Sequence, residues 1–215
     1  MEKIGELARI FYGKLSPLKT MMVHDVGNVE KCGISKEKFA SFTEDFSKFL
    51  IKSSGKRIEL TFDDGHESLY TEAYPILKKY GIKFTAFLVS DFIDRPNYLS
   101  ENEIKEMLSS GLLVIGAHGK THRILTSLNP EETTCEICDC KQVLESRFRV
   151  SVTKYAYSHG QYTDYSLEIL RNNGFYEAYM AQYSFWGGNK YLKPRMNLCD
   201  QQYQYISSFL RKSGY

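Results

Sequence analysis

Apolar residues in this chain form short continuous runs, and stretches with helical spacing separate the runs. Most of the runs are β-prone and are followed by glycine, polar or charged residues, which is typical of buried strands. They cover residues 20–24, 57–62, 83–89, 112–117, 154–157, 175–181 and 195–198.

The intervening stretches predict helices with identifiable ends. Phe39, Phe42 and Phe46 recur on one face after a capping Ser35. This spacing predicts an amphipathic helix over residues 36–53, with its aromatic side chains in the core. Capping residues and terminal glycines predict further helices over residues 68–80, 100–109, 129–147 and 164–172.

The order of these elements predicts the fold class. Strands that alternate with helices indicate an α/β fold with a mainly parallel sheet. At least three predicted strands end in polar residue types that are suited to catalysis. Because the carboxyl ends of parallel strands form one face, we expect a barrel-like arrangement with a single active face.

Composition narrows the class of protein. A length of 215 residues, with 42% hydrophobic and 25% charged residues, predicts a single globular domain over residues 1–215. The net charge of +2 and the lack of a basic stripe with interleaved aromatic residues argue against nucleic-acid binding. No apolar run approaches the length of a membrane span, so we expect no stable membrane insertion.

The amino terminus and the cysteines predict a location. Residues 1–11 are mixed and charged and show no secretory signal, and five cysteines, an odd number, fit reduced thiols. We therefore expect a cytoplasmic protein. Cys135, Cys138 and Cys140 are close enough to suggest a metal site, but one helical turn cannot direct all three thiols at one ion.

Two groups of polar residues follow predicted strands. Asp63 and Asp64 come directly after the run at 57–62, and His118 and His122 follow the run at 112–117. Successive residues at a strand end point to different sides, so the two aspartates can take different roles. Asp-Asp-Gly is also ordinary turn chemistry, and two surface histidines at this spacing are common. Each group taken alone therefore leaves a structural explanation open.

Taken together, the two groups predict a mononuclear metal site. Two imidazoles and one carboxylate leave coordination positions open, which is the catalytic pattern. The spacing of His118 and His122 puts both imidazoles on one side if the segment forms a helical turn. One aspartate would bind the metal, and its neighbour would act as a base toward the attacking water.

These residues also resemble a known family. Residues 61–65 (TFDDG) and 118–122 (HGKTH) are similar to the first two motifs of the NodB-homology polysaccharide deacetylases, carbohydrate esterase family 4. Residues 155–160 (YAYSHG) loosely resemble the third motif, and residues 22–26 (MVHDV) resemble a Tyr-His-Asp-Val stretch of one subgroup. The resemblance extends over residues 20–198.

The resemblance implies a distorted (β/α) barrel of about seven strands that removes N-acetyl groups from amino sugars with a divalent metal, usually zinc. It implies that Asp63 is the catalytic base and that the metal ligands are Asp64, His118 and His122. The backbone N–H of His159 would match the oxyanion donor of the third motif.

The sequence departs from the family pattern at three places. Ser158 and His159 stand where Pro and Tyr are usual, and Ala156 stands where many members place an arginine that orients the base. The C-terminal Leu-x-His that supplies the general acid is missing from residues 195–198. His24 is the candidate acid, because the similar subgroup looks circularly permuted. The alternative for His24 is a structural histidine near a strand end, and His159 is then the candidate acid.

Other residues carry weaker expectations. His66 follows the first motif and is expected on the surface or beside the site. Tyr183 and Trp186 lie where the family places apolar groups around the acetyl methyl, although a lone tryptophan is as often a packing anchor. Lys120 and Arg123 could meet an anionic substrate, and their alternative role is that of solvated surface charges.

The resulting prediction is a metal-dependent deacetylase of an N-acylated amino sugar or oligosaccharide that belongs to a surface glycan or its precursor. The substrate could be nucleotide-linked, lipid-linked or a nascent chain, and a formyl group could replace the acetyl group. The altered third and fifth motifs leave two alternatives, a glycan-binding relative that has lost turnover and a hydrolase of another amide. The sequence specifies neither the sugar, the native metal nor the oligomeric state.

Overall fold

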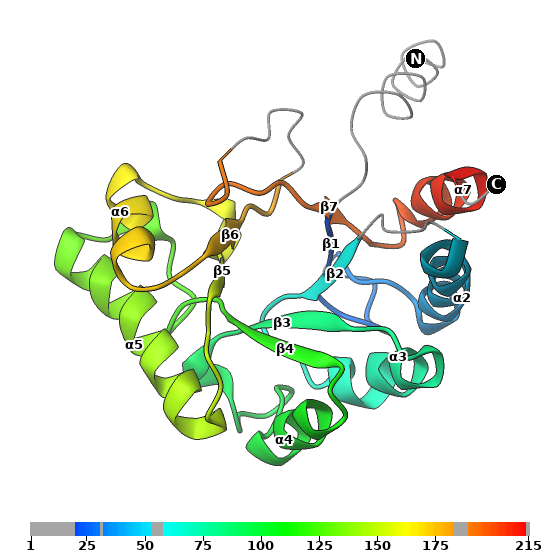
Figure 1. The fold of residues 1–215 in the computed structure, drawn as a ribbon, viewed down its shortest axis with the longest axis horizontal. Helices are drawn as coiled ribbons and strands as arrows, with labels where there is room; N and C mark the ends of the chain where they lie inside the picture. Colours follow the sequence, from blue (N-terminus) through cyan, green and yellow to red (C-terminus); the bar gives the residue numbers. More distant parts are fainter. Residues whose placement is uncertain (1–19, 31, 53–57, 183–188, 214–215) are drawn as a thin grey trace, which may run out of the picture.

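Seven parallel strands form one curled sheet in the computed structural model of this chain, which describes residues 20–30, 32–52, 58–182 and 189–213. The order across the sheet is β6-β5-β4-β3-β2-β1-β7 (Figure 1). The strands are β1 (Thr20–Val23), β2 (Glu59–Phe62), β3 (Phe84–Leu88), β4 (Leu113–Ala117), β5 (Lys154–Ala156), β6 (Glu177–Tyr179) and β7 (Met196–Asn197). All seven predicted runs therefore contain a strand, with shorter limits than the runs suggest.

Helices cover the outer side of the sheet (Figure 1). This arrangement is the distorted (β/α) barrel expected from the sequence. The helices are α2 (Lys36–Lys52), α3 (Tyr74–Tyr80), α4 (Glu101–Ser109), α5 (Pro130–Phe148), α6 (Asp164–Asn172) and α7 (Tyr203–Ser213).

Residues 193–197 contact both the β6 edge and the β1 edge of the sheet. The N–H of Lys193 donates to the carbonyl of Ala178 at 2.9 Å, and the N–H of Met180 donates to the carbonyl of Lys193 at 2.8 Å. Residues 196 and 197 then pair with β1 as strand β7. Arg195 therefore lies where the two edges of the curled sheet approach each other.

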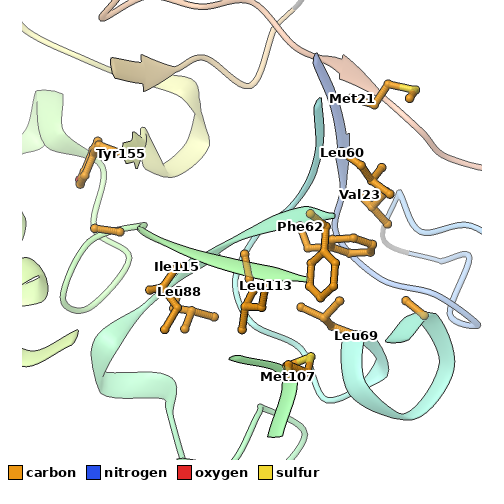
Figure 2. Packing of buried hydrophobic residues seen from close by; sticks show 14 of the residues in the cluster. Met21, Val23, Leu60, Phe62, Leu69, Leu88, Met107, Leu113, Ile115 and Tyr155 are labelled. Carbon is orange, nitrogen blue, oxygen red and sulfur yellow. The ribbon is translucent and has the colours of Figure 1, made fainter. Parts of the chain in front are cut away.

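The main core lies between the sheet and the helices. Strand residues such as Leu60 and Phe62 pack there against helix residues such as Leu69 and Met107 (Figure 2). Because neighbouring strand residues face opposite sides, Phe87 and Tyr179 point to the inner side of the sheet. These two side chains form a separate buried cluster with Ala156, and their ring centroids are 5.2 Å apart.

Helix limits follow the predicted caps with one exception. Ser100 and Asn129 both form capping boxes, with Glu103 and Glu132. The predicted helix over residues 68–80 begins instead as a π-helical turn, Leu69–Ala73, before α3. Pro75 explains the change, because it has no N–H to continue the α-helical pattern.

Helix α7 was not predicted from the sequence. Tyr203, Ile206 and Leu210 form an apolar stripe with helical spacing, and this stripe could have revealed it. The helix contacts α2, where the Tyr203 hydroxyl donates to Ser41 Oγ at 2.8 Å and Arg211 pairs with Asp45 at 2.8 Å.

Replacing Phe42 with Ala is expected to lower the free energy of unfolding by about 3–5 kcal/mol, because the ring is fully buried and the change leaves a cavity. Ile51→Ala on the same helix is the matched control, since Ile51 is 82% exposed, and should cost less than about 0.5 kcal/mol. Urea unfolding measures both. Equal losses would contradict the assignment of this helix face to the core.

Candidate metal centre and catalytic base

The two aspartates lie directly after β2 and face different partners. Asp63 is 2% exposed, and its N–H donates to the carbonyl of Val23 at 2.9 Å. The chain turns at the next two residues, where Asp64 has φ +67° and Gly65 has φ +79°. A side chain at Gly65 would also approach Leu88 to 3.0 Å, so both backbone and space favour glycine.

The two histidines come from a loop after β4 and not from a helical turn, so the expected helical geometry is wrong. His118 is buried, and its N–H donates to the carbonyl of Leu88 at 2.9 Å. Gly119 and His122 both have positive φ, +89° and +67°. These left-handed residues bend the chain so that the imidazole of His122 returns toward His118, with ring centroids 4.9 Å apart.

Asp64, His118 and His122 place three potential metal ligands together. Asp64 Oδ1 lies 3.3 Å from His118 Nε2 and 3.2 Å from His122 Nε2. The ligand atoms of the three residues lie within 4.8 Å of one another, and no other such group of His, Cys, Asp and Glu occurs in the described part of the chain. The cysteines of α5 thus form no such group.

The hydrogen bonds of His118 favour a cation at this point. Its Nδ1 lies 2.8 Å from the carbonyl oxygen of Ala156, which assigns the proton to Nδ1 and leaves Nε2 facing Asp64. Asp64 Oδ1 is shielded from solvent and has no hydrogen-bond partner among the described residues. One carboxylate and two imidazoles suit Zn²⁺ or a similar divalent ion and leave coordination positions open.

The pKa shifts of Asp64 and His118 agree with a cation site at this cluster. Burial raises the pKa of Asp64, but the close imidazoles of His118, His122 and His66 outweigh burial and lower the pKa well below its usual range. Burial lowers the pKa of His118, yet the charges of Asp63 and Asp64 produce a net rise. The cluster therefore attracts positive charge.

Arg195 holds Asp63 with both arms of its guanidinium group. Nη1 donates to Asp63 Oδ1 and Nη2 to Oδ2, both at 2.6 Å, while Nε donates to the carbonyl of Met180 at 2.9 Å. Burial raises the pKa of Asp63, but Arg195 and His118 outweigh it, so the net pKa lies below its ordinary value. Asp63 is thus kept ionised and fixed in orientation.

Sequence analysis missed this role of Arg195. Ala156 stands where many members of the resembling family have an arginine that orients the base, and Arg195, just before β7, supplies a guanidinium from elsewhere in the chain. The two partners are 132 residues apart, so no local pattern joins them. An arginine within a short apolar run was the one available indication.

His24 follows β1, at the same carboxyl edge of the sheet as Asp63. The pKa of Asp63 depends mainly on burial, Arg195 and His118. The charge of His24 also lowers it, so His24 lies within electrostatic reach of Asp63. Its Nδ1 is shielded from solvent and has no hydrogen-bond partner among the described residues. The alternative role of His24, a structural histidine near a strand end, would require a hydrogen-bond partner at this nitrogen, and the described residues supply none.

His159 and His66 both lie beside the cluster. The His159 ring is 4.7 Å from that of His122, and desolvation together with His122 and His118 lowers its pKa. His66 Nε2 lies 3.6 Å from Asp64 Oδ2, so His66 stands beside the site. Tyr183 and Trp186, expected near the acetyl group, lie outside the described residues.

Comparison with known proteins identifies relatives. Residues 51–178 match the family model described as polysaccharide deacetylase. Bacillus subtilis (strain 168) YxkH, whose name assigns it to the polysaccharide deacetylases, is 35% identical over 124 residues, which are 58% of this chain and 44% of YxkH. A poly-β-1,6-N-acetyl-D-glucosamine N-deacetylase of Staphylococcus aureus (strain MRSA252) is 26% identical over 166 residues, 70% of this chain and 57% of that enzyme.

A solved structure confirms the fold. The Streptococcus pyogenes deacetylase PplD, determined in complex with acetate, superposes with a TM-score of 0.80 at 19% identity and covers 94% of this chain and 100% of PplD. The chain spans about half the length of the curated relatives that it matches, 44% and 57%.

Replacing Arg195 with Met is expected to lower the free energy of unfolding by about 3–5 kcal/mol, because the buried carboxylate of Asp63 loses its partner. The double variant Asp63→Asn/Arg195→Met should lose less than the sum of the single variants. The pKa of Asp63 is lower in the folded state, so this contribution is present at neutral pH and is lost as the pH falls through that value.

Urea unfolding of the metal-free protein measures these losses. Arg211→Met is the control, since the side chain of Arg211 is exposed in its pair with Asp45. This replacement should lower the free energy of unfolding by less than about 1 kcal/mol. Equal losses for Arg195→Met and Arg211→Met would show that the buried pair does not stabilise the fold.

Proposed function

Because this chain belongs to the polysaccharide deacetylase family, we propose that it hydrolyses the N-acetyl amide of an amino sugar in a surface glycan or its precursor. In this proposal it is a hydrolase of linear amide C–N bonds that uses a divalent metal, preferably Zn²⁺. The observation that carries the proposal is the ionised Asp63 directly beside the cluster of Asp64, His118 and His122.

Asp64, His118 and His122 would hold the metal, which when bound would polarise the amide carbonyl and acidify water. Asp63 would accept the proton of the attacking water. Arg195 binds both carboxylate oxygens of Asp63 and so keeps this base at a fixed position. The backbone N–H of His159 is proposed as a donor to the oxyanion that develops in the transition state.

A general acid must protonate the departing amine, because an amide anion is a very poor leaving group. We propose His24 for this role, since it lies at the same strand edge as Asp63 and its Nδ1 has no partner within the described residues. His159 is the second candidate, and its position against His122 supports it.

The relatives support a substrate class. The Staphylococcus aureus relative is named for poly-β-1,6-N-acetyl-D-glucosamine. We infer that this chain acts on an N-acetylglucosamine-type amino sugar. Attachment of that sugar to a nucleotide or a lipid and a cytoplasmic location remain predictions from the sequence. No described helix combines the length and apolar character that crossing a membrane requires.

The rival function, glycan binding without turnover, was motivated by the missing arginine at Ala156 and the missing histidine in residues 195–198. Arg195, the residue before β7, supplies the first of these groups. We propose that His24 supplies the second. The contact of Arg195 with Asp63 and the position of His24 after β1, at the same edge of the sheet, support hydrolysis over binding alone.

Asp63→Asn is expected to lower the rate of acetate release by about 10²–10⁴-fold and to leave metal content unchanged, because the amide cannot act as a base. Asp64→Ala should lose both metal and activity, since it removes a proposed ligand. Acetate release from N-acetylglucosamine oligomers and elemental analysis of the purified variants measure the two effects. Loss of metal in Asp63→Asn with retention in Asp64→Ala would reverse the two roles.

His24→Ala and His159→Ala separate the two candidate acids. With His24 as the acid, kcat should fall by about 10²–10⁴-fold in His24→Ala and much less in His159→Ala. Metal content serves as the control, because neither residue belongs to the proposed ligand set. An unchanged kcat in His24→Ala would remove His24 from the mechanism.

A further inference from the structure

The carboxylate of Glu136 lies against the loop that carries both histidines. Glu136 belongs to α5 and is only 4% exposed. Its Oε1 accepts the N–H of Thr121 at 2.8 Å and the N–H of Arg123 at 3.2 Å. Its Oε2 accepts the hydroxyl of Thr121 at 2.8 Å, and its backbone carbonyl accepts the N–H of Lys120 at 2.9 Å.

These bonds flank His122, whose φ of +67° lies in the left-handed region. A non-glycine residue in that region is strained and persists only where its surroundings fix it. Oε1 of Glu136 binds the N–H groups immediately before and after His122, so this one atom fixes the strained conformation. The fit is close, because a Cβ at Gly119 would lie 2.7 Å from the same oxygen.

We propose that Glu136 is a positioning residue that sets the affinity of the metal centre by holding His122 in place. The inference rests on the proposed function and extends it to a residue that belongs to neither the base nor the ligand set. Glu136 acts through backbone bonds to the loop, so the reach of its side chain should matter more than its charge. Partners that orient metal ligands are typically worth 10–100-fold in metal affinity.

A second contact between α5 and the same loop provides a matched control. Lys120 Nζ lies 2.8 Å from Asp139 Oδ2, but both side chains are about two-fifths exposed, 38% and 41%. Such an exposed pair contributes little. Asp139→Asn therefore removes one negative charge from the same helix without releasing the backbone of the loop.

Co²⁺ binding to the purified full chain tests the proposal. Glu136→Asp keeps the charge, but its shorter side chain moves the carboxylate oxygens away from the loop N–H groups. This variant should bind Co²⁺ about 10–100-fold more weakly and alter the visible absorption spectrum of the bound ion. Glu136→Gln keeps an acceptor at the same reach, so it should bind as the wild type does, as should Asp139→Asn. Wild-type affinity in Glu136→Asp, or a loss in Glu136→Gln as large as in Glu136→Asp, would overturn the proposal.

A measurement without metal separates this proposal from the proposed function. Amide hydrogen exchange at Thr121 and Arg123 should be faster in metal-free Glu136→Asp than in the wild type and in Glu136→Gln. Equal exchange in all three proteins would refute the positioning role. A wild-type chain that binds no Co²⁺ would contradict the proposed metal centre, and the exchange rates would still decide the role of Glu136.

Discussion

The site depends on the stabilisation of two adjacent carboxylates that are largely removed from water. Neighbouring buried anions repel each other and lose their hydration, so each requires its own positive partner. Asp63 obtains one from the two-armed contact with Arg195, and Asp64 faces two imidazole nitrogens at 3.2–3.3 Å. The two partners differ in kind. A guanidinium remains charged and leaves Asp63 a fixed anion, whereas paired imidazoles can share Asp64 with a metal ion.

The parallel sheet brings these groups together. His24, Asp63 and His118 each follow the carboxyl end of a strand, and in a parallel sheet those ends share one edge. Arg195 arrives differently, because it precedes β7 and lies on the segment that joins the β6 edge to the β1 edge. Closure of the barrel and orientation of the proposed base therefore depend on the same few residues.

The sequence predicted the parts of the site that local patterns encode. Asp63, Asp64, His118 and His122 were found because each pair follows an apolar run, and the capping boxes of Ser100 and Asn129 defined their helices. Contacts between distant residues were not predictable, since Arg195 and Glu136 reach their partners only through the closed barrel and the docking of α5. The loop geometry of His122 was missed for a related reason: a four-residue spacing suggests a helix, while the positive φ depends on tertiary hydrogen bonds.

Three residues with a strained backbone lie where the proposed chemistry takes place. Asp64, His122 and His159 all have positive φ, between 56° and 67°, although none is a glycine. Glycine would relieve this strain but would also remove the side chains that form the cluster, so the fold must compensate elsewhere. Compensation is visible at His122, where Glu136 binds the flanking N–H groups. The same loop gains a further bond at His118, whose carbonyl accepts the hydroxyl of Ser158 at 2.9 Å. Ser158 replaces the proline that is usual in the third motif, so this departure from the family adds a hydrogen bond to the loop that a proline could not make.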